Sequence, residues 1–330
     1  MVRNTLTRIR RERSITPPFP PSKIILTPDA LTRSQFQSPL FSTIPPETRN
    51  TIFIFSLLSY VKDRDLYDPE THYTRPGYEG KRTYPTNLLW TCKRIYLETH
   101  DLPFLLNGHT FTFYYEKAPP AYKQPHKVFP LIPKENLWQI TTIRLNMQQY
   151  WLEGGFYPVL QELRVLPALK TLRIVLRHGD WWNWELNEKL GIDPHQVYPD
   201  IVSWDKMVSA YHCAVSNRGR PNLDIRSPAW GAKFSMIRTL ERLEFEFETL
   251  TSKRNQLDLI VEFSKYWRFP LQDGKMLVRE EMLTEVYGWD GPKSFIVSNP
   301  DAVPVEEEEL KRCPELGFTY QVRVATWRKC

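Results

Sequence analysis

The feature that most constrains the fold of this chain is an apolar pattern that occurs three times. In each copy, an apolar residue is followed three positions later by a second one, and then by apolar residues at alternate positions. The copies read Ile140-x-x-Ile143-x-Leu145-x-Met147, Leu169-x-x-Leu172-x-Ile174-x-Leu176 and Leu240-x-x-Leu243-x-Phe245-x-Phe247. Alternation with period two is typical of a β-strand with one buried face. The pattern therefore predicts three half-buried strands.

Amphipathic helical patterns lie between or after these strands. Their apolar positions are Val159, Leu160, Leu163 and Leu166, then Trp204, Met207, Val208, Tyr211 and Val215, then Leu257, Ile260 and Val261. Strands that alternate with amphipathic helices imply βαβ crossovers and parallel pairing. We therefore predict an α/β fold with an open, mostly parallel sheet, and a last strand over residues 318–327, after an acidic loop at residues 306–309.

The three copies are similar to leucine-rich repeats in form, but the match is partial. The Asn that such a repeat places after its strand is replaced by Gln148, Arg177 and Glu248, and the copies are spaced by 29 and then 71 residues. The sheet is therefore expected to be a degenerate, leucine-rich-repeat-like one.

The basic balance of the chain is concentrated in its first residues. Residues 1–33 carry a net charge of +5 out of +6 for all 330 residues. A phosphate-binding groove needs its positive charge on the folded body, so this distribution argues against nucleic-acid binding. Residues 1–38 are also rich in proline, and we interpret them as a disordered basic leader. A nuclear-import patch at residues 8–13 and a mitochondrial presequence are the alternatives.

Cysteine usage and hydropathy indicate an intracellular protein, cytoplasmic or nuclear. The longest apolar runs are much too short to span a bilayer, and no secretory signal pattern opens the sequence. The four cysteines form no C-x-x-C pair and are interpreted as reduced thiols, with no metal site expected. They are Cys92, Cys213, Cys313 and Cys330.

A helical region precedes the strands. Pro45 and Pro46 suit the first turn of a helix, and Ile52, Phe55 and Leu58 follow on roughly one face. Residues 61–86 form a polar, turn-rich insertion. A second helix is expected from residues 86–87 to Pro103, with Leu88, Cys92, Ile95 and Leu102 on one face, and a strand over residues 110–115.

Three blocks in this region resemble the signature of a fungal F-box-like family of unknown function, written LPPE-R-IY, CRQIY-E and NTF-F. The blocks are Ile44-Pro45-Pro46-Glu47-Thr48-Arg49-Asn50-x-Ile52-Phe53, Leu88-Leu89-x-Thr91-Cys92-Lys93-Arg94-Ile95-Tyr96-x-Glu98 and Asn107-x-x-Thr110-Phe111-x-Phe113. The resemblance covers about residues 40–115. Together with the strand and helix patterns, it leads us to expect a single α/β domain over residues 39–330, with an F-box-like segment at 39–115 merged with the repeat-like sheet at 116–330.

The resemblance also implies a function. An F-box docks onto a Skp1-type adaptor of ubiquitin ligases, and the sheet would then recognise substrates. The residues expected to contact the adaptor are Pro45, Pro46, Ile52, Phe55 and Leu58. We therefore expect a non-enzymatic interaction adaptor that needs no cofactor or small-molecule ligand. An interaction protein unrelated to ubiquitin is the alternative, because an apolar helix face commonly packs into its own core.

Arg177-His178-Gly179 is the motif that most suggests an enzyme, because it is similar to the Arg-His-Gly motif of histidine phosphatases. That chemistry needs a second histidine and further groups brought together by the fold. His195 and His212 are the available histidines downstream, and neither has a recognisable context. We therefore expect no catalytic site, and a histidine-phosphatase-like hydrolase is the enzyme alternative.

Trp181, Trp182 and Trp184 stand close together after the second strand. Tryptophan is enriched in protein-binding hot spots, so these residues are a second candidate partner site. The alternative is that the rings fold back over the sheet and bury a large apolar area.

Overall fold

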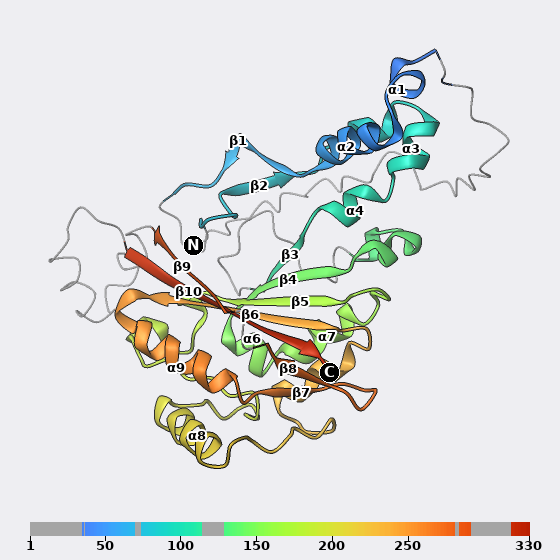
Figure 1. Ribbon diagram of the computed structural model, residues 1–330. Coiled ribbons are helices and arrows are strands. Elements are labelled where there is room, and N and C mark those ends of the chain that lie inside the picture. The colour runs from blue at the N-terminus through green and yellow to red at the C-terminus, as the bar shows by residue number, and fades with distance from the viewer. Residues whose placement is uncertain (1–34, 36, 70–73, 114–128, 281–283, 292–317) are drawn as a thin grey trace, which may run out of the picture. The chain divides into compact units, whose positions relative to one another are not determined.

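The computed structural model describes residues 35, 37–69, 74–113, 129–280, 284–291 and 318–330 (Figure 1). The predicted leader lies almost entirely outside the described residues, as does the acidic loop at 306–309. The chain divides into two compact units, Met1–Arg49 and Asn50–Cys330. The first contains α1 (Pro39–Ser42) and the start of α2 (Pro46–Leu57), which ends in the second.

The second unit contains an eight-stranded sheet in the order β3-β4-β5-β6-β10-β8-β7, with β9 also paired to β10. The strands are β3 (His109–Phe113), β4 (Thr142–Met147), β5 (Thr171–Leu176), β6 (Arg242–Leu250), β7 (Arg268–Pro270), β8 (Met276–Arg279), β9 (Glu285–Gly291) and β10 (Phe318–Lys329). Strands β3 to β6 are parallel. The predicted α/β class and parallel central strands are confirmed. An antiparallel half around β10, which the sequence did not indicate beyond a last strand, completes the sheet.

The three copies of the apolar pattern lie in register on β4, β5 and β6. Leu145 pairs with Ile174, and Ile174 pairs with Phe245. Successive side chains of a strand point to opposite faces of its sheet, so the apolar residues of all three strands form continuous rows on one face. All of them are buried.

Helices cover this apolar face (Figure 1). They are α6 (Gln149–Glu153), α7 (Phe156–Leu163), α8 (Trp204–Ser216) and α9 (Arg254–Ser264), so all three predicted helical patterns are confirmed. Short 3₁₀ turns join these elements: η2 (Phe129–Leu131), η3 (Lys134–Gln139), η4 (His178–Asp180), η5 (Trp184–Leu186), η6 (Trp230–Met236) and η7 (Thr251–Lys253).

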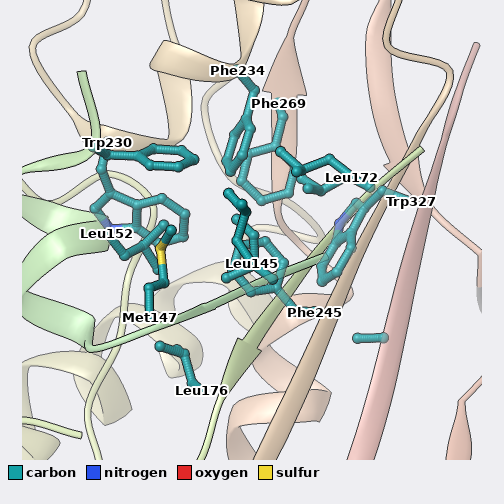
Figure 2. Close-up of a cluster of buried hydrophobic side chains, with 14 of the residues drawn as sticks. Leu145, Met147, Leu152, Leu172, Leu176, Trp230, Phe234, Phe245, Phe269 and Trp327 are labelled. Atoms are coloured by element: carbon teal, nitrogen blue, oxygen red, sulfur yellow. The ribbon is translucent and has the colours of Figure 1, made fainter. Parts of the chain in front are cut away.

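The core under these helices is unusually aromatic (Figure 2). Phe245 of β6 lies 5.6 Å from Trp327 of β10, edge to face, and 6.2 Å from Phe234 of η6. Trp267, just before β7, stacks on Trp327 at 5.9 Å between ring centroids. Aromatic pairs in these geometries contribute about 0.5–1.5 kcal/mol each beyond the burial of their area. The parallel and antiparallel halves of the sheet thus share one core.

The predicted helix from residues 86–87 to Pro103 was wrong in extent. The chain instead forms η1 (Asn87–Trp90), α3 (Lys93–Thr99) and α4 (Leu102–Leu106). Cys92 adopts an extended conformation and separates η1 from α3. Pro103 lies in the first turn of α4, where its missing N–H costs no hydrogen bond, so it opens a helix here.

The polar insertion contains a two-stranded antiparallel hairpin of β1 (Tyr60–Leu66) and β2 (Gly80–Thr83). A Cβ at Gly80 would lie 2.5 Å from the carbonyl oxygen of Asp65, so the close approach of the two strands requires glycine there. The hairpin forms a sheet of its own among the described strands.

Candidate partner-binding surface

Helix α2 buries a narrow stripe and exposes most of its apolar side chains. Arg49, Phe53 and Leu57, which are spaced four residues apart, are its buried positions. The side chains proposed for partner contact lie outside this stripe: Ile52 is 39% exposed, Phe55 71% and Leu58, just past the helix end, 38%. Pro45 and Pro46 are exposed as well. Ile52, Phe55 and Leu58 are therefore not part of the core that the described residues form.

The buried side chain of Asn107 holds the C-terminal end of α2 in place. Its Nδ2 donates to the carbonyl oxygens of Leu57 at 3.1 Å and Pro103 at 2.9 Å. Its Oδ1 accepts from the N–H of Ser59 at 2.7 Å. One amide thereby satisfies backbone groups at the ends of two helices. The sequence indicated Asn107 only as the first residue of the third block. Its role at α2 was missed because Leu57 and Ser59 are about fifty residues away in the chain.

Trp90 is the most exposed large apolar side chain in the described part of the chain, at 85%. Sequence reasoning missed it, because a continuous helix over residues 87–102 places Leu88, Cys92 and Ile95 on the apolar face and gives Trp90 no special position. The extended Cys92 interrupts that helix. A single exposed tryptophan has a large apolar area to offer a partner, so Trp90 joins α2 as a candidate contact.

The tryptophans after β5 lie against the sheet. Trp181 is 3% exposed, stacks on Phe247 at 6.0 Å, and its Nε1 donates to the carbonyl oxygen of Glu248 at 2.9 Å. Trp184 is half-buried and packs against the core. The buried ring of Trp181 is not available to a partner in this conformation, and the alternative interpretation, a roof over the sheet, accounts for its position.

Trp182 is half-buried and belongs to a polar contact with helix α6. Its Nε1 donates to Oε2 of the buried Glu153 at 2.7 Å, and Gln149 donates to Oε1 of the same carboxylate at 2.8 Å. Burial raises the pKa of Glu153 to about 7, although the hydrogen bonds from Gln149 and Trp182 lower it. The loop after β5 is thereby fixed by its tryptophans at two places, the sheet and α6.

The histidine of the Arg-His-Gly motif is buried. His178 lies 5.9 Å from the ring of Trp184 and 6.2 Å from that of Tyr320. Burial, with the nearby Lys253, lowers the pKa of His178 to about 3, so the ring is neutral. Arg177 pairs with Asp180 at 3.3 Å. A phosphoryl group needs access to both side chains, and this setting offers it to neither. The structure brings neither His195 nor His212 into a described hydrogen bond with His178.

Among the residues that the structure describes, no group of three or more His, Cys, Asp or Glu side chains is arranged to hold a metal ion. Over the same residues, no helix combines the length and hydropathy of a membrane span.

Family models, curated proteins and solved structures were compared with this chain, and none of them matches it.

Proposed function

We propose that this protein is a non-catalytic interaction adaptor whose partner binds the exposed face of α2. The observation that carries the proposal is the exposure of Ile52, Phe55 and Leu58. The hydrogen bonds of Asn107 hold this face on a fixed backbone. Preorganised apolar side chains bind at a lower entropic cost than side chains on a mobile segment.

The partner proposed for this face is a Skp1-type adaptor of ubiquitin ligases. Its identity comes from the resemblance of the three sequence blocks to F-box-like proteins. The eight-stranded sheet is then the part of the chain that recognises substrates. In the alternative function, the chain is an interaction protein unrelated to ubiquitin and uses the same face for a different partner. The identity of the bound protein therefore decides between the two functions.

Phe55 is expected to contribute most to binding. Complete burial of a phenylalanine side chain stabilises a complex by about 1.5–3 kcal/mol, and Phe55 is 71% exposed before binding. An aspartate at this position leaves a charge in an apolar contact. We therefore expect Phe55→Asp to weaken adaptor binding at least tenfold.

The test is isothermal titration of the purified full chain with a purified Skp1-type adaptor. Leu186→Asp is the matched control, because Leu186 is an apolar side chain with 59% exposure on η5. Binding by wild type and by Leu186→Asp, with loss in Phe55→Asp, supports the proposal. No binding by wild type refutes the ubiquitin-ligase assignment. Equal binding by Phe55→Asp and wild type refutes the assignment of the face.

Thermal unfolding separates a binding defect from a folding defect. Phe53, two residues before Phe55 and on the buried side of α2, is 1% exposed, and its truncation to alanine is expected to cost about 3–5 kcal/mol. Phe55→Ala is expected to change the free energy of unfolding by less than about 0.5 kcal/mol, as is usual for exposed positions. A large loss of stability in Phe55→Ala contradicts the assignment of Phe55 to a free surface.

A further inference from the structure

The face of the sheet opposite the aromatic core carries a row of buried carboxylates. Glu244, Glu246 and Glu248 alternate along β6 with the core residues, so they point to this second face. They are 6%, 0% and 2% exposed. A buried carboxylate is unfavourable unless cations and hydrogen-bond donors pair with it. This row therefore needs positively charged partners close to it.

Two arginines of the neighbouring strands supply part of that charge. Arg144 of β4 places its Nη2 2.8 Å from both oxygens of Glu246. Arg173 of β5 places its Nε 2.5 Å from Glu244 and its Nη1 3.6 Å from Glu246. These pairs follow from the register, which sets Arg144, Arg173 and Glu244 side by side. Glu248 receives no arginine from β4 or β5 in the ion pairs described.

Arg242 of β6 itself pairs with Glu244 at 2.6 Å. A further partner is Arg75, from the loop between β1 and β2. Its Nη2 lies 2.5 Å from Glu246 and 3.1 Å from Glu248, and its side chain is only 4% exposed. The indole Nε1 of Trp289 donates to Glu248 at 3.0 Å. The hairpin loop thus reaches over the parallel strands to β6 and places a guanidinium between two carboxylates.

The fit of Arg75 to this position is incomplete. Its Nε and Nη1 are buried without a hydrogen-bond partner among the described residues. On the same level of the sheet as Glu246, the buried Oδ1 of Asn146 has no described partner either. Buried polar groups in folded proteins are nearly always paired, so an arginine that served folding alone is expected to meet both carboxylates with more than one nitrogen. Arg75 therefore has donors that its present contacts leave unused, and the Oδ1 of Asn146 is an acceptor without a described partner.

The loop that carries Arg75 is attached to the sheet by side chains. Strands β1 and β2 pair with each other, and in the described residues they make no ladder with the eight-stranded sheet. Tyr78 provides a second contact, with its ring 4.7 Å from the Arg144 guanidinium and its hydroxyl 3.3 Å from Thr110. Release of the loop therefore breaks side-chain contacts and leaves the sheet's backbone pairing intact.

We propose that Glu246, Glu248 and Trp289 form a guanidinium-binding site that Arg75 fills in the free protein and that an arginine of a partner protein fills in a complex. Arginine is favoured over lysine because its planar fork meets carboxylates with two parallel hydrogen bonds. The exchange replaces one guanidinium by another, so the buried carboxylates remain paired. The proposal does not rest on partner binding at α2.

The experiment uses the full chain with Arg75→Ala and two probes, N-acetyl-arginine amide and N-acetyl-lysine amide. Binding is measured by titration calorimetry, with indole fluorescence as a second readout because Trp289 lies in the site. We expect Arg75→Ala to bind the arginine probe at least tenfold more tightly than the lysine probe. We also expect binding at least tenfold tighter than that of wild type, where Arg75 competes. Adding Glu248→Gln to the variant is expected to weaken arginine binding at least tenfold.

Arg323→Ala is the matched control. Arg323 is also an arginine with 4% side-chain exposure, and it pairs with Asp258 at 2.8 Å, on the core-facing side. If the two alanine variants bind the arginine probe equally well, the probe only fills the space that any removed arginine leaves, and the proposal is overturned. It is also overturned if folded Arg75→Ala does not bind the probe. If Arg75→Ala does not fold, Arg75→Gln, which keeps an amide donor and loses the charge, is measured under the same criteria.

Discussion

Glu153 makes the stability of the folded protein depend on pH, and one substitution is enough to isolate this effect. The residue is 1% exposed, and its carboxylate accepts hydrogen bonds from Gln149 and Trp182. Lys233 places its Nζ 3.5 Å from the backbone oxygen of Glu153, so this contact does not involve the carboxylate. Asp193 opposes ionisation as well. Folding therefore moves this carboxylate from water to a position where its charge is poorly compensated.

The size of the effect follows from the two pKa values. The pKa of Glu153 rises from 4.5 to about 7 on folding, and each unit corresponds to about 1.4 kcal/mol. Because the folded state holds the proton more tightly, the contribution of Glu153 to stability is greatest below pH 4.5. It declines as the pH rises to about 7 and is constant above that. The full loss of stability between low pH and pH values above about 7 is about 3 kcal/mol.

Urea unfolding of wild type and Glu153→Gln at several pH values between 4.5 and 8 measures this loss. Glutamine cannot ionise, and its amide nitrogen faces the donor of Gln149, so the variant loses about 1 kcal/mol at every pH. The stability of the variant relative to wild type is expected to increase by about 3 kcal/mol between pH 4.5 and 7. A difference that does not change with pH contradicts the argument, because it means that burial does not disfavour the charged form of Glu153.

Two further predictions concern buried side chains near the loop after β5. The pKa of His178 falls from 6.5 to about 3 on folding, so its contribution to stability is present above pH 6.5 and is lost as the pH falls, by about 1.4 kcal/mol per pH unit. Urea unfolding of His178→Gln is expected to lack this dependence of stability on pH. The same change of stability with pH in variant and wild type contradicts the prediction. Trp181→Phe keeps the contact with Phe247 but leaves the Glu248 carbonyl without its indole donor. The free energy of unfolding, measured by thermal unfolding, is expected to fall by about 1–3 kcal/mol. No measurable loss of stability would mean that water replaces the donor.

The parallel centre of the sheet could be predicted because apolar residues alternate with other residues along each of its strands. Leu145, Ile174 and Phe245 belong to long period-two patterns, and each such pattern is a strand. Strands β7 and β8 have three and four residues, too few for a period to be recognised. Strand β9 contains Gly288 and mostly exposed positions, so neither propensity nor hydropathy indicated it.

The second face of the sheet could not be predicted for a different reason. Alternation of Glu with Leu or Phe along β6 is the usual pattern of a strand with one face in water, yet both faces are buried here. The burial depends on Arg75, which is 171 residues from Glu246 in the chain. Local patterns contain no information on an ion pair at that separation. The hydrogen bond from Asn107 to Leu57 also joins residues that are far apart in the chain. The apolar face of α2 could therefore be predicted from its pattern, but the hydrogen bonds that hold the helix in place could not.

The position of β10 has a consequence for the order in which the chain can fold during synthesis. This strand pairs with β6 on one side and with β8 and β9 on the other, and it follows all three in sequence. Until it emerges from the ribosome, β6 is an edge strand with unpaired backbone groups along Arg242–Leu250, and Trp327 is missing from the core. The nascent chain therefore exposes an aggregation-prone strand edge from the synthesis of β6 until that of β10, and we expect it to depend on chaperones over this interval.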